Sequence, residues 1–372
     1  MLAPMSSPQI HMPRLCVRLA ATLIVGALLA AGCAGGDDGK GATEAPTSKV
    51  PVSSSTPSSS STTEPADDEP VPSPGCGTST AKAVREEKRT IDVAGAERWF
   101  LLTNPEHDAE TPVPLVLDLH GLSEGAQVHT LMSAFSDLAQ KEGFAVVFPN
   151  GTGSPVHWET SLDATENIDI AFVKAILDTL GKDLCLDQSR VYATGLSNGA
   201  MMSSVLACTL SDRIAAIAPV AGVAKPDGCD PARPVPVLAF HGTADEILLF
   251  NGGIGSGLSR ALGSRNGATT VSTAPRPIDL DGAGYPATAA AWADHNGCEA
   301  DPTDEEVGDE VTRRVYDCPP EGAVEFVIVE DGGHTWPGST LSKAIVAIVG
   351  HTTFDIDATE EIWKFFQRFR LP

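Results

Sequence analysis

Short apolar segments alternate along this chain with segments whose apolar residues recur at helical spacing, and few folds accommodate that order. The expected buried strands are "PLVLDLH" (114–120), "FAVVFPN" (144–150), "RVYATG" (190–195), "RIAAIAPVAG" (213–222), "VPVLAFHG" (235–242) and "AVEFVIVE" (323–330). The expected helices are "HTLMSAFSDLAQKEG" (129–143), "NIDIAFVKAILDTLGKD" (167–183), "GAMMSSVLAC" (199–208) and "TEEIWKFFQRF" (359–369). "RTIDVAGAERWFLLTNP" (89–105) alternates around a glycine and predicts a hairpin at a sheet edge. The order predicts an α/β fold, a mostly parallel sheet with helices on both faces.

In such sheets the functional loops follow the carboxyl ends of the strands. A chain of 372 residues with 42% hydrophobic residues is long enough for two domains. We nevertheless expect one large domain, residues 76–372, because the strands and helices fall in that range.

Residues 1–33 are interpreted as a secretory signal rather than as part of the fold. Arg14 and Arg18 precede an apolar run, 19–31, that is short for a membrane span, and Met12 is an alternative start. The run ends in "LLAAGC", which resembles the lipobox of bacterial lipoproteins and makes Cys33 the candidate lipidation site. The match is imperfect, and cleavage nearby to give a soluble secreted protein is the alternative.

Residues 34–75 consist mainly of Ser, Thr, Pro, Gly and acidic residues, with few side chains to bury. Such a composition predicts a disordered linker. The expected protein is therefore extracellular or a cell-surface lipoprotein, with its globular domain held clear of the membrane.

The formal net charge of −24 argues against a nucleic-acid partner, because phosphate binding requires clustered Lys and Arg. No Cys-x-x-Cys or His-x-x-x-His spacing indicates a metal site, and no organic cofactor is expected.

Eight cysteines are present, of which Cys16 leaves with the signal and Cys33 is the lipidation candidate. The remaining even number in an exported domain predicts disulfides. Cys298 with Cys318 is the expected pair, and Cys208 with Cys229 and Cys76 with Cys185 are further candidate pairs.

The pattern Gly-x-Ser-x-Gly occurs twice, in "HGLSEG" (120–125) and in "TGLSNG" (194–199). In serine hydrolases this pattern carries the nucleophile on a strained turn between a strand and a helix. A chain rich in glycine produces a match by chance, so the surroundings must decide. Ser197 follows a predicted strand and precedes a helix that opens with Asn198, which makes it the candidate nucleophile. The alternative is an ordinary glycine-rich turn with an N-capping serine.

Ser123 is a poorer candidate because only the edge hairpin lies upstream of it. A nucleophile in this fold needs one oxyanion donor from the amide that follows it and another from a loop after an earlier strand. "LDLHGLSEG" supplies such a loop for Ser197, so the N–H groups of Leu122 and Asn198 are the expected donors.

Asp245 and His334 complete the candidate constellation. Each lies just past a predicted strand, in "FHGTADE" and "EDGGHTWPG", and the order Ser, Asp, His is the one this fold uses. The histidine would take the serine proton and the carboxylate would fix its tautomer. Asp227, Asp230 and Asp281 compete with Asp245 but follow no predicted strand, and His120 and His241 are expected to be structural.

These segments, with "AAAWADHNGC" and "DATEEIWKFF", resemble a known family. They are similar to the secreted α/β-hydrolases that group polyhydroxybutyrate depolymerases with feruloyl and acetylxylan esterases, and more closely to the actinobacterial lipoprotein esterases called LpqC. The likeness covers about residues 76–372. It implies an α/β-hydrolase fold and a serine esterase with Ser197, Asp245 and His334 as its triad, and it supports Leu122 as an oxyanion donor.

The chain departs from the family pattern in ways that leave the acyl specificity open. Leu122 stands where many members have cysteine, Ile170 follows Asp169 where many have a second aspartate, and residues 251–267 form a glycine-rich insertion. Trp158 and Trp336 are candidate substrate-binding residues for an aromatic or polymeric ester, with simple packing as the alternative.

The sequence thus predicts a secreted or lipid-anchored carboxylic ester hydrolase that acts on small or polymeric esters through an acyl-enzyme, without a metal or cofactor. An acyltransferase of the same fold, with a sugar or lipid acceptor, is one alternative. A binding module on a hydrolase scaffold is another, and an intact triad argues against it.

Overall fold

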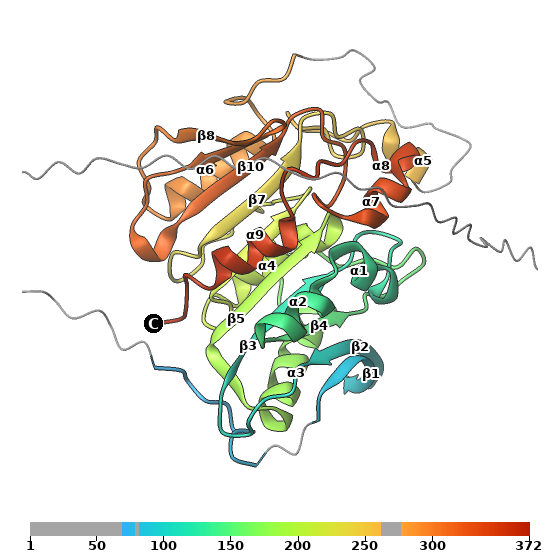
Figure 1. Cartoon of the computed structure of the whole chain (residues 1–372), viewed down its shortest axis with the longest axis vertical. Helices are drawn as coiled ribbons and strands as arrows, with labels where there is room; N and C mark the ends of the chain where they lie inside the picture. Colours follow the sequence, from blue (N-terminus) through green and yellow to red (C-terminus); the bar gives the residue numbers. More distant parts are fainter. Residues whose placement is uncertain (1–68, 79–81, 262–276) are drawn as a thin grey trace, which may run out of the picture. The chain divides into compact units, whose positions relative to one another are not determined.

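The computed structural model describes residues 69–78, 82–261 and 277–372, which contain a sheet of ten strands (Figure 1). The parallel strands are β3 (Val113–Leu119), β4 (Ala145–Pro149), β5 (Leu186–Leu196), β6 (Ala216–Val220), β7 (Val237–Gly242) and β10 (Val324–Val329). The antiparallel strands are β1 (Val84–Val93), β2 (Ala96–Asn104), β8 (Thr303–Gly308) and β9 (Val311–Val315). The order across the sheet is β1-β2-β4-β3-β5-β6-β7-β10-β9-β8.

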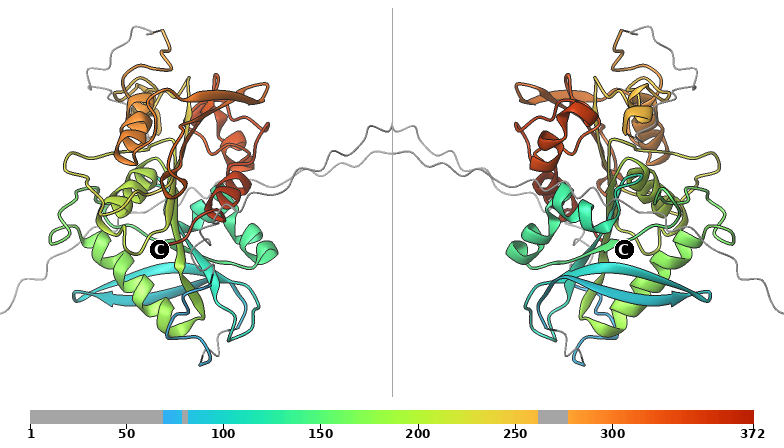
Figure 2. Two further views of the ribbon diagram at one scale, coloured as in Figure 1. Left: turned by 90° about the vertical axis from the view of Figure 1, so that its left-hand side faces the viewer. Right: turned by 90° about the vertical axis from the view of Figure 1, so that its right-hand side faces the viewer.

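Helices cover both faces of the sheet (Figure 2). One face carries α3 (Ile168–Asp183), α4 (Asn198–Thr209) and α6 (Tyr285–His295), and the other carries α1 (Ala126–Ser133), α2 (Phe135–Glu142) and α9 (Ala358–Phe366). Successive strand residues point to opposite faces, so Leu115 and Leu117 pack on the α3 side and Val116 on the α1 side. The predicted α/β-hydrolase fold class is confirmed.

The remaining helices are short and follow the carboxyl ends of parallel strands, after β7 and after β10. They are α5 (Gly257–Ala261), α7 (Thr340–Ala344) and α8 (Val346–Val349), and a 3₁₀ turn, η1, spans Pro320–Gly322. Among the described residues, none of the helices combines the length and apolar character that a membrane crossing needs.

The predicted strands and the edge hairpin are confirmed, while some element boundaries differ. The helix expected over 129–143 is two helices, because Ala134 adopts a φ of 55° that ends α1 and starts α2. The hairpin of β8 and β9 was not predicted, because β8 is exposed and acidic and so lacks the alternation of a half-buried strand. The helices α5, α6, α7 and α8 were also not predicted.

Disulfides join Cys76 to Cys185, Cys208 to Cys229 and Cys298 to Cys318, which are the pairings that the sequence suggested. The first of them lies beside a segment that was assigned to the linker. Ser73 is buried and its hydroxyl donates to the carbonyl of Leu184, so residues around it belong to the domain. The signal, Cys33 and the linker up to residue 68 lie outside the described residues.

Strand β3, strand β5 and the start of α4 approach one another closely at the carboxyl ends of the strands. A Cβ atom on Gly199 would lie 2.0 Å from the carbonyl oxygen of Leu119, and one on Gly195 would lie 2.4 Å from the same atom. Only glycine fits at such distances. This contact sets the loop after β3 directly against the turn between β5 and α4.

We expect Gly199→Ala to lower the free energy of unfolding by about 3 kcal/mol or more, because its methyl group has no space beside a backbone carbonyl. Urea unfolding followed by circular dichroism measures the loss. Gly143→Ala is the matched control, since Gly143 has a φ of +79° but no atom lies within 4 Å of the place that a Cβ would occupy. Its expected loss is about 1 kcal/mol, from backbone strain alone. Equal losses in the two variants would contradict the close packing of position 199 against the Leu119 carbonyl.

Candidate active site

Ser197 lies on a sharp turn between β5 and α4. Its φ of 57° and ψ of −115° are unusual for a residue with a side chain. The turn is held because the Ser197 N–H donates to the carbonyl of Val220 at 2.8 Å. Such a strained strand-to-helix turn presents a serine hydroxyl at the top of the sheet.

His334 and Asp245 come together from the loops after β10 and β7. The Nδ1 atom of His334 lies 2.7 Å from Oδ2 of Asp245, and both side chains are buried. Oδ1 of Asp245 accepts the N–H groups of Ile247 at 2.7 Å and Leu248 at 2.8 Å. Burial alone would raise the pKa of Asp245, but the neighbouring His334, the nearby His241 and the hydrogen bond from Leu248 lower it below its usual value. Asp245 is therefore a carboxylate that orients the His334 ring.

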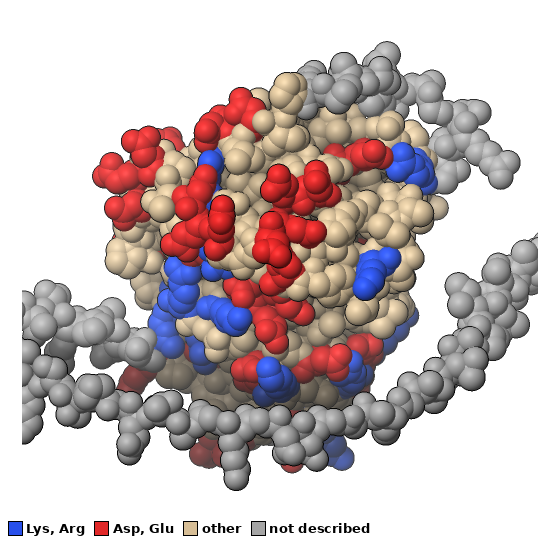
Figure 3. Space-filling model, turned by 45° about the horizontal axis from the view of Figure 1, so that its top comes forward, with Lys and Arg blue, Asp and Glu red and all other residues tan. Residues whose placement is uncertain are grey.

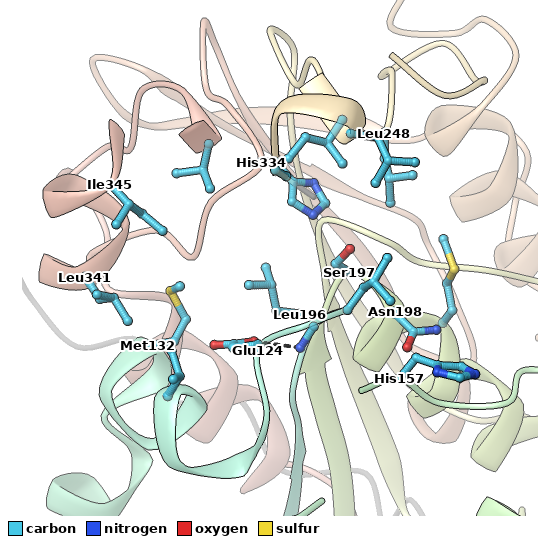
Figure 4. Close-up of a pocket in the computed structure, with 18 residues that line it drawn as sticks. Glu124, Met132, His157, Leu196, Ser197, Asn198, Leu248, His334, Leu341 and Ile345 are labelled. Atoms are coloured by element: carbon cyan, nitrogen blue, oxygen red, sulfur yellow. Dashed lines mark hydrogen bonds between the residues drawn. The ribbon is translucent and has the colours of Figure 1, made fainter. Parts of the chain in front are cut away.

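Ser197 and His334 line the same cavity, which has a volume of about 430 Å³. The hydroxyl of Ser197 points toward the ring of His334, and both side chains lie at the surface of the cavity (Figure 4). The backbone of His334 is held by a hydrogen bond, because its N–H donates to the carbonyl of Val349 at 2.6 Å. The structure thus brings together the three side chains that the sequence singled out.

The two expected oxyanion donors border this cavity. Leu122 and Asn198 both line it, and neither backbone N–H donates to another described residue. The side chain of Asn198 is occupied elsewhere, since its Oδ1 accepts the N–H of Trp158 at 2.7 Å and its Nδ2 donates to the Trp158 carbonyl at 3.2 Å. The backbone amide is the group of Asn198 that remains available at the cavity.

His120 and His241 are structural, as expected. Nδ1 of His120 donates to the Gly121 carbonyl and Nε2 accepts the Gly151 N–H, so the ring is neutral. Burial lowers the pKa of His120 to about 4. His241 donates from Nε2 to the carbonyl of Leu248, and burial lowers its pKa to about 4 as well.

Trp158 and Trp336 do not line the cavity, which corrects their interpretation as substrate-binding residues. Trp158 is 2% exposed and its indole N–H donates to the His120 carbonyl at 2.8 Å. Trp336 is 1% exposed and donates to the hydroxyl of Thr359 at 2.9 Å. Both are packing residues, because their polar ends are satisfied inside the protein and their rings face the core. His157 lines the cavity in place of its neighbour Trp158.

The cavity walls are mainly aliphatic. They come from α1, from the end of β5, from α4, from the loop that follows β7 and from the short helices and their junction: Val128, Met132, Leu196, Met201, Ile247, Leu248, Leu258, Ala261, Leu341, Ile345 and Val349. None of the described lining residues is Phe, Tyr or Trp. These walls suit an apolar, flexible chain better than a planar aromatic ring.

A buried charged cluster was missed by sequence reasoning. His129 contacts Asp118 through Nε2 at 2.7 Å and Glu124 through Nδ1 at 3.0 Å. Asp118 was the available signal, because it interrupts an otherwise apolar buried strand. Within the described residues, no group of three or more His, Cys, Asp or Glu is arranged to hold a metal ion.

Comparison with known proteins places this chain in a family. A family model described as "Esterase PHB depolymerase" matches residues 99–252. Feruloyl esterase C of Emericella nidulans is 30% identical over 238 residues, which are 61% of this chain and 78% of that enzyme. Feruloyl esterase B of Piromyces equi is 31% identical over 229 residues, 59% of this chain, but the match spans only 39% of that longer enzyme.

Among solved structures, the acetyl xylan esterase from Aspergillus awamori superposes with a TM-score of 0.47 at 17% identity, covering 70% of this chain and 98% of that one. The matched segment 99–252 runs from β2 past the Ser197 turn and Asp245. The chain belongs to the esterase family of PHB depolymerases and feruloyl esterases.

Proposed function

We propose that this protein hydrolyses carboxylic esters through an acyl-enzyme, with Ser197 as the nucleophile. One observation carries the proposal. A serine on a strained turn faces, in an apolar cavity, a histidine whose other nitrogen is bonded to a buried carboxylate. Membership of an esterase family supports the same chemistry.

The proposed reaction uses each of these groups once in acylation and once in deacylation. Because Asp245 accepts the Nδ1 proton of His334, Nε2 is free to take the proton of Ser197 as its oxygen attacks the ester carbonyl. His334 then returns this proton to the departing alcohol, and the acyl group stays on the serine. A water molecule, activated by the same imidazole, releases the free acid.

Negative charge develops on the carbonyl oxygen in both steps. The N–H groups of Leu122 and Asn198 are the proposed donors that stabilise it, because both border the cavity and neither donates to another described residue.

The cavity favours an aliphatic acyl group. Burial of methylene groups against its leucine, isoleucine and methionine side chains stabilises the bound acyl chain, whereas the described lining offers no Phe, Tyr or Trp to stack on a phenolic acid. We therefore propose short to medium aliphatic acyl esters as the substrate class of this chain.

The proposed location is outside the cytoplasm. Three disulfides are typical of an oxidising compartment. The signal over residues 1–33 and lipidation of Cys33 remain part of this proposal. Figure 3 shows acidic side chains spread over much of one face, with a smaller group of basic side chains at its left and single basic residues elsewhere.

Replacement of Ser197 by alanine should reduce hydrolysis of p-nitrophenyl butyrate by about 10⁴-fold or more, because the covalent step is lost. Ser123→Ala is the control, since Ser123 lies in the other Gly-x-Ser-x-Gly stretch and has no role in the proposed reaction. Its kcat should stay within about twofold of wild type. Release of free acid, followed by pH-stat without an added acceptor alcohol, separates hydrolysis from acyl transfer. Equal loss in both variants would contradict the assignment.

A lengthened acyl chain should raise the specificity constant. Each methylene that moves from water into the cavity contributes about 0.8 kcal/mol, or about fourfold. Butyrate carries two more methylene groups than acetate, so we expect kcat/KM for p-nitrophenyl butyrate to exceed that for p-nitrophenyl acetate by about fifteenfold. With the leaving group held constant, methyl butyrate should react faster than methyl ferulate. Faster hydrolysis of the ferulate would overturn the aliphatic assignment.

A further inference from the structure

A chain of buried charges ends at the backbone of the proposed oxyanion loop. His129 is fully buried and bonded to two carboxylates, Asp118 on one side and Glu124 on the other. The hydroxyl of Ser133 donates to the second oxygen of Asp118 at 2.5 Å. Burial by itself would lower the pKa of His129, but the two carboxylates raise it to about 10. His129 is therefore a cation at neutral pH.

Glu124 connects this cation to the loop. Its Oε1 contacts Nδ1 of His129 at 3.0 Å, and its Oε2 accepts the N–H of Gly121 at 2.6 Å. Both carboxylate oxygens are thus used within the protein. Figure 4 shows Glu124 at the cavity wall, below the Ser197 turn, with a dashed line marking its hydrogen bond to the Gly121 amide.

The backbone N–H groups on either side of Leu122 are each held by a hydrogen bond. The N–H of Gly121 donates to Glu124, that of Ser123 donates to the Val156 carbonyl at 2.8 Å, and that of Glu124 donates to the Gly121 carbonyl at 3.2 Å. Between them, the N–H of Leu122 donates to no described residue, and Leu122 lines the cavity. Fixing the neighbouring amides therefore determines where the Leu122 amide points.

The positive charge of His129 supports the oxyanion hole in a second, electrostatic way. A carboxylate beside a developing oxyanion would repel it, and that repulsion is strong in an apolar cavity. The imidazolium of His129, in contact with Glu124, offsets it. Asp118 holds the ring from the opposite side, so that the cation stays at Glu124.

We propose that Glu124, held by the ion pair of His129 with Asp118, is a positioning residue for the oxyanion hole: it fixes the Gly121 amide so that the Leu122 N–H is aimed at the ester oxygen. This proposal rests on the proposed esterase function. Glu124 touches no reacting atom in it and acts through the backbone. Its removal should therefore affect the chemical step for every ester alike.

The test compares Glu124→Ala with Glu124→Gln on p-nitrophenyl acetate and p-nitrophenyl butyrate. In Glu124→Ala the loop loses its acceptor, and kcat should fall about 10²-fold on both esters, with KM changed less than about threefold. In Glu124→Gln the amide oxygen can still accept the Gly121 N–H, so kcat should stay within about tenfold of wild type. Thermal melts accompany both variants. Should Glu124→Ala fail to melt cooperatively, Glu124→Asp replaces it, because the shorter carboxylate cannot reach both partners, and the same loss is expected.

Val128→Ala is the matched control on the same wall. Val128 lines the cavity from α1 but takes no part in the hydrogen bonds of the loop. It should weaken butyrate turnover relative to acetate, whereas Glu124→Ala should leave that ratio unchanged.

The outcomes separate the positioning role of Glu124 from the esterase function on which it rests. If Ser197→Ala hydrolyses esters as fast as wild type, the esterase proposal fails. If Ser197→Ala is inactive while Glu124→Ala keeps the wild-type kcat, or loses activity only through KM or on one ester, the positioning role alone is wrong. Equal losses in Glu124→Ala and Glu124→Gln would also overturn it, because charge rather than the acceptor oxygen would then be responsible.

Discussion

The carbonyl oxygen of Leu119 is the atom on which the geometry of the candidate site depends. It occupies the space that a side chain at position 199 would need, so the end of β3 and the start of α4 share one region. As a result, a Cβ on Gly121 would lie 3.7 Å from the Cβ of Ser197. A comparable contact, 2.1 Å between a Cβ on Gly242 and the Gly332 carbonyl oxygen, draws the Asp245 loop toward the His334 loop. Close backbone packing at the ends of neighbouring parallel strands therefore brings together the loops that carry the candidate site residues.

Buried histidines in this protein differ in charge because their surroundings differ. His120 is held by backbone groups, and His241 donates to a backbone carbonyl with its Nε2 also 3.3 Å from Oδ2 of Asp245; burial lowers the pKa of each to about 4. His129 is equally buried, but its two carboxylate partners raise its pKa to about 10. The same residue type is thus a neutral ring that holds a loop in one place and a cation at neutral pH in another. The proposed base, His334, is distinct again, with a single carboxylate on Nδ1 and a cavity on its other side.

The proposed chemistry and the proposed acyl specificity use different parts of the fold. The candidate triad residues follow the parallel strands, whereas much of the cavity wall comes from α1 and the short helices α5 and α7. Such peripheral segments can change the acyl pocket without disturbing the sheet. The two tryptophans beside the site do not line the cavity, since both are buried and hydrogen-bonded within the protein, and the backbone of Trp158 holds the side chain of Asn198.

The sequence by itself determined the fold class and predicted that Ser197, Asp245 and His334 lie just past buried strands, because both depend on local pattern, whereas it offered the disulfide pairs only as candidates. Apolar runs specify strands, and polar residues just past those runs lie at one edge of a parallel sheet. Only the tertiary structure decided what surrounds those residues. Trp158 and Trp336 adjoin site residues in the chain yet point into the core. His129 belongs to no motif and Glu124 occupies a variable position of the Gly-x-Ser-x-Gly stretch at 121–125, and their partnership exists because α1 packs its histidine against Asp118 on β3. Contacts between separate elements set the burial and the charge of a side chain, and no local pattern encodes them.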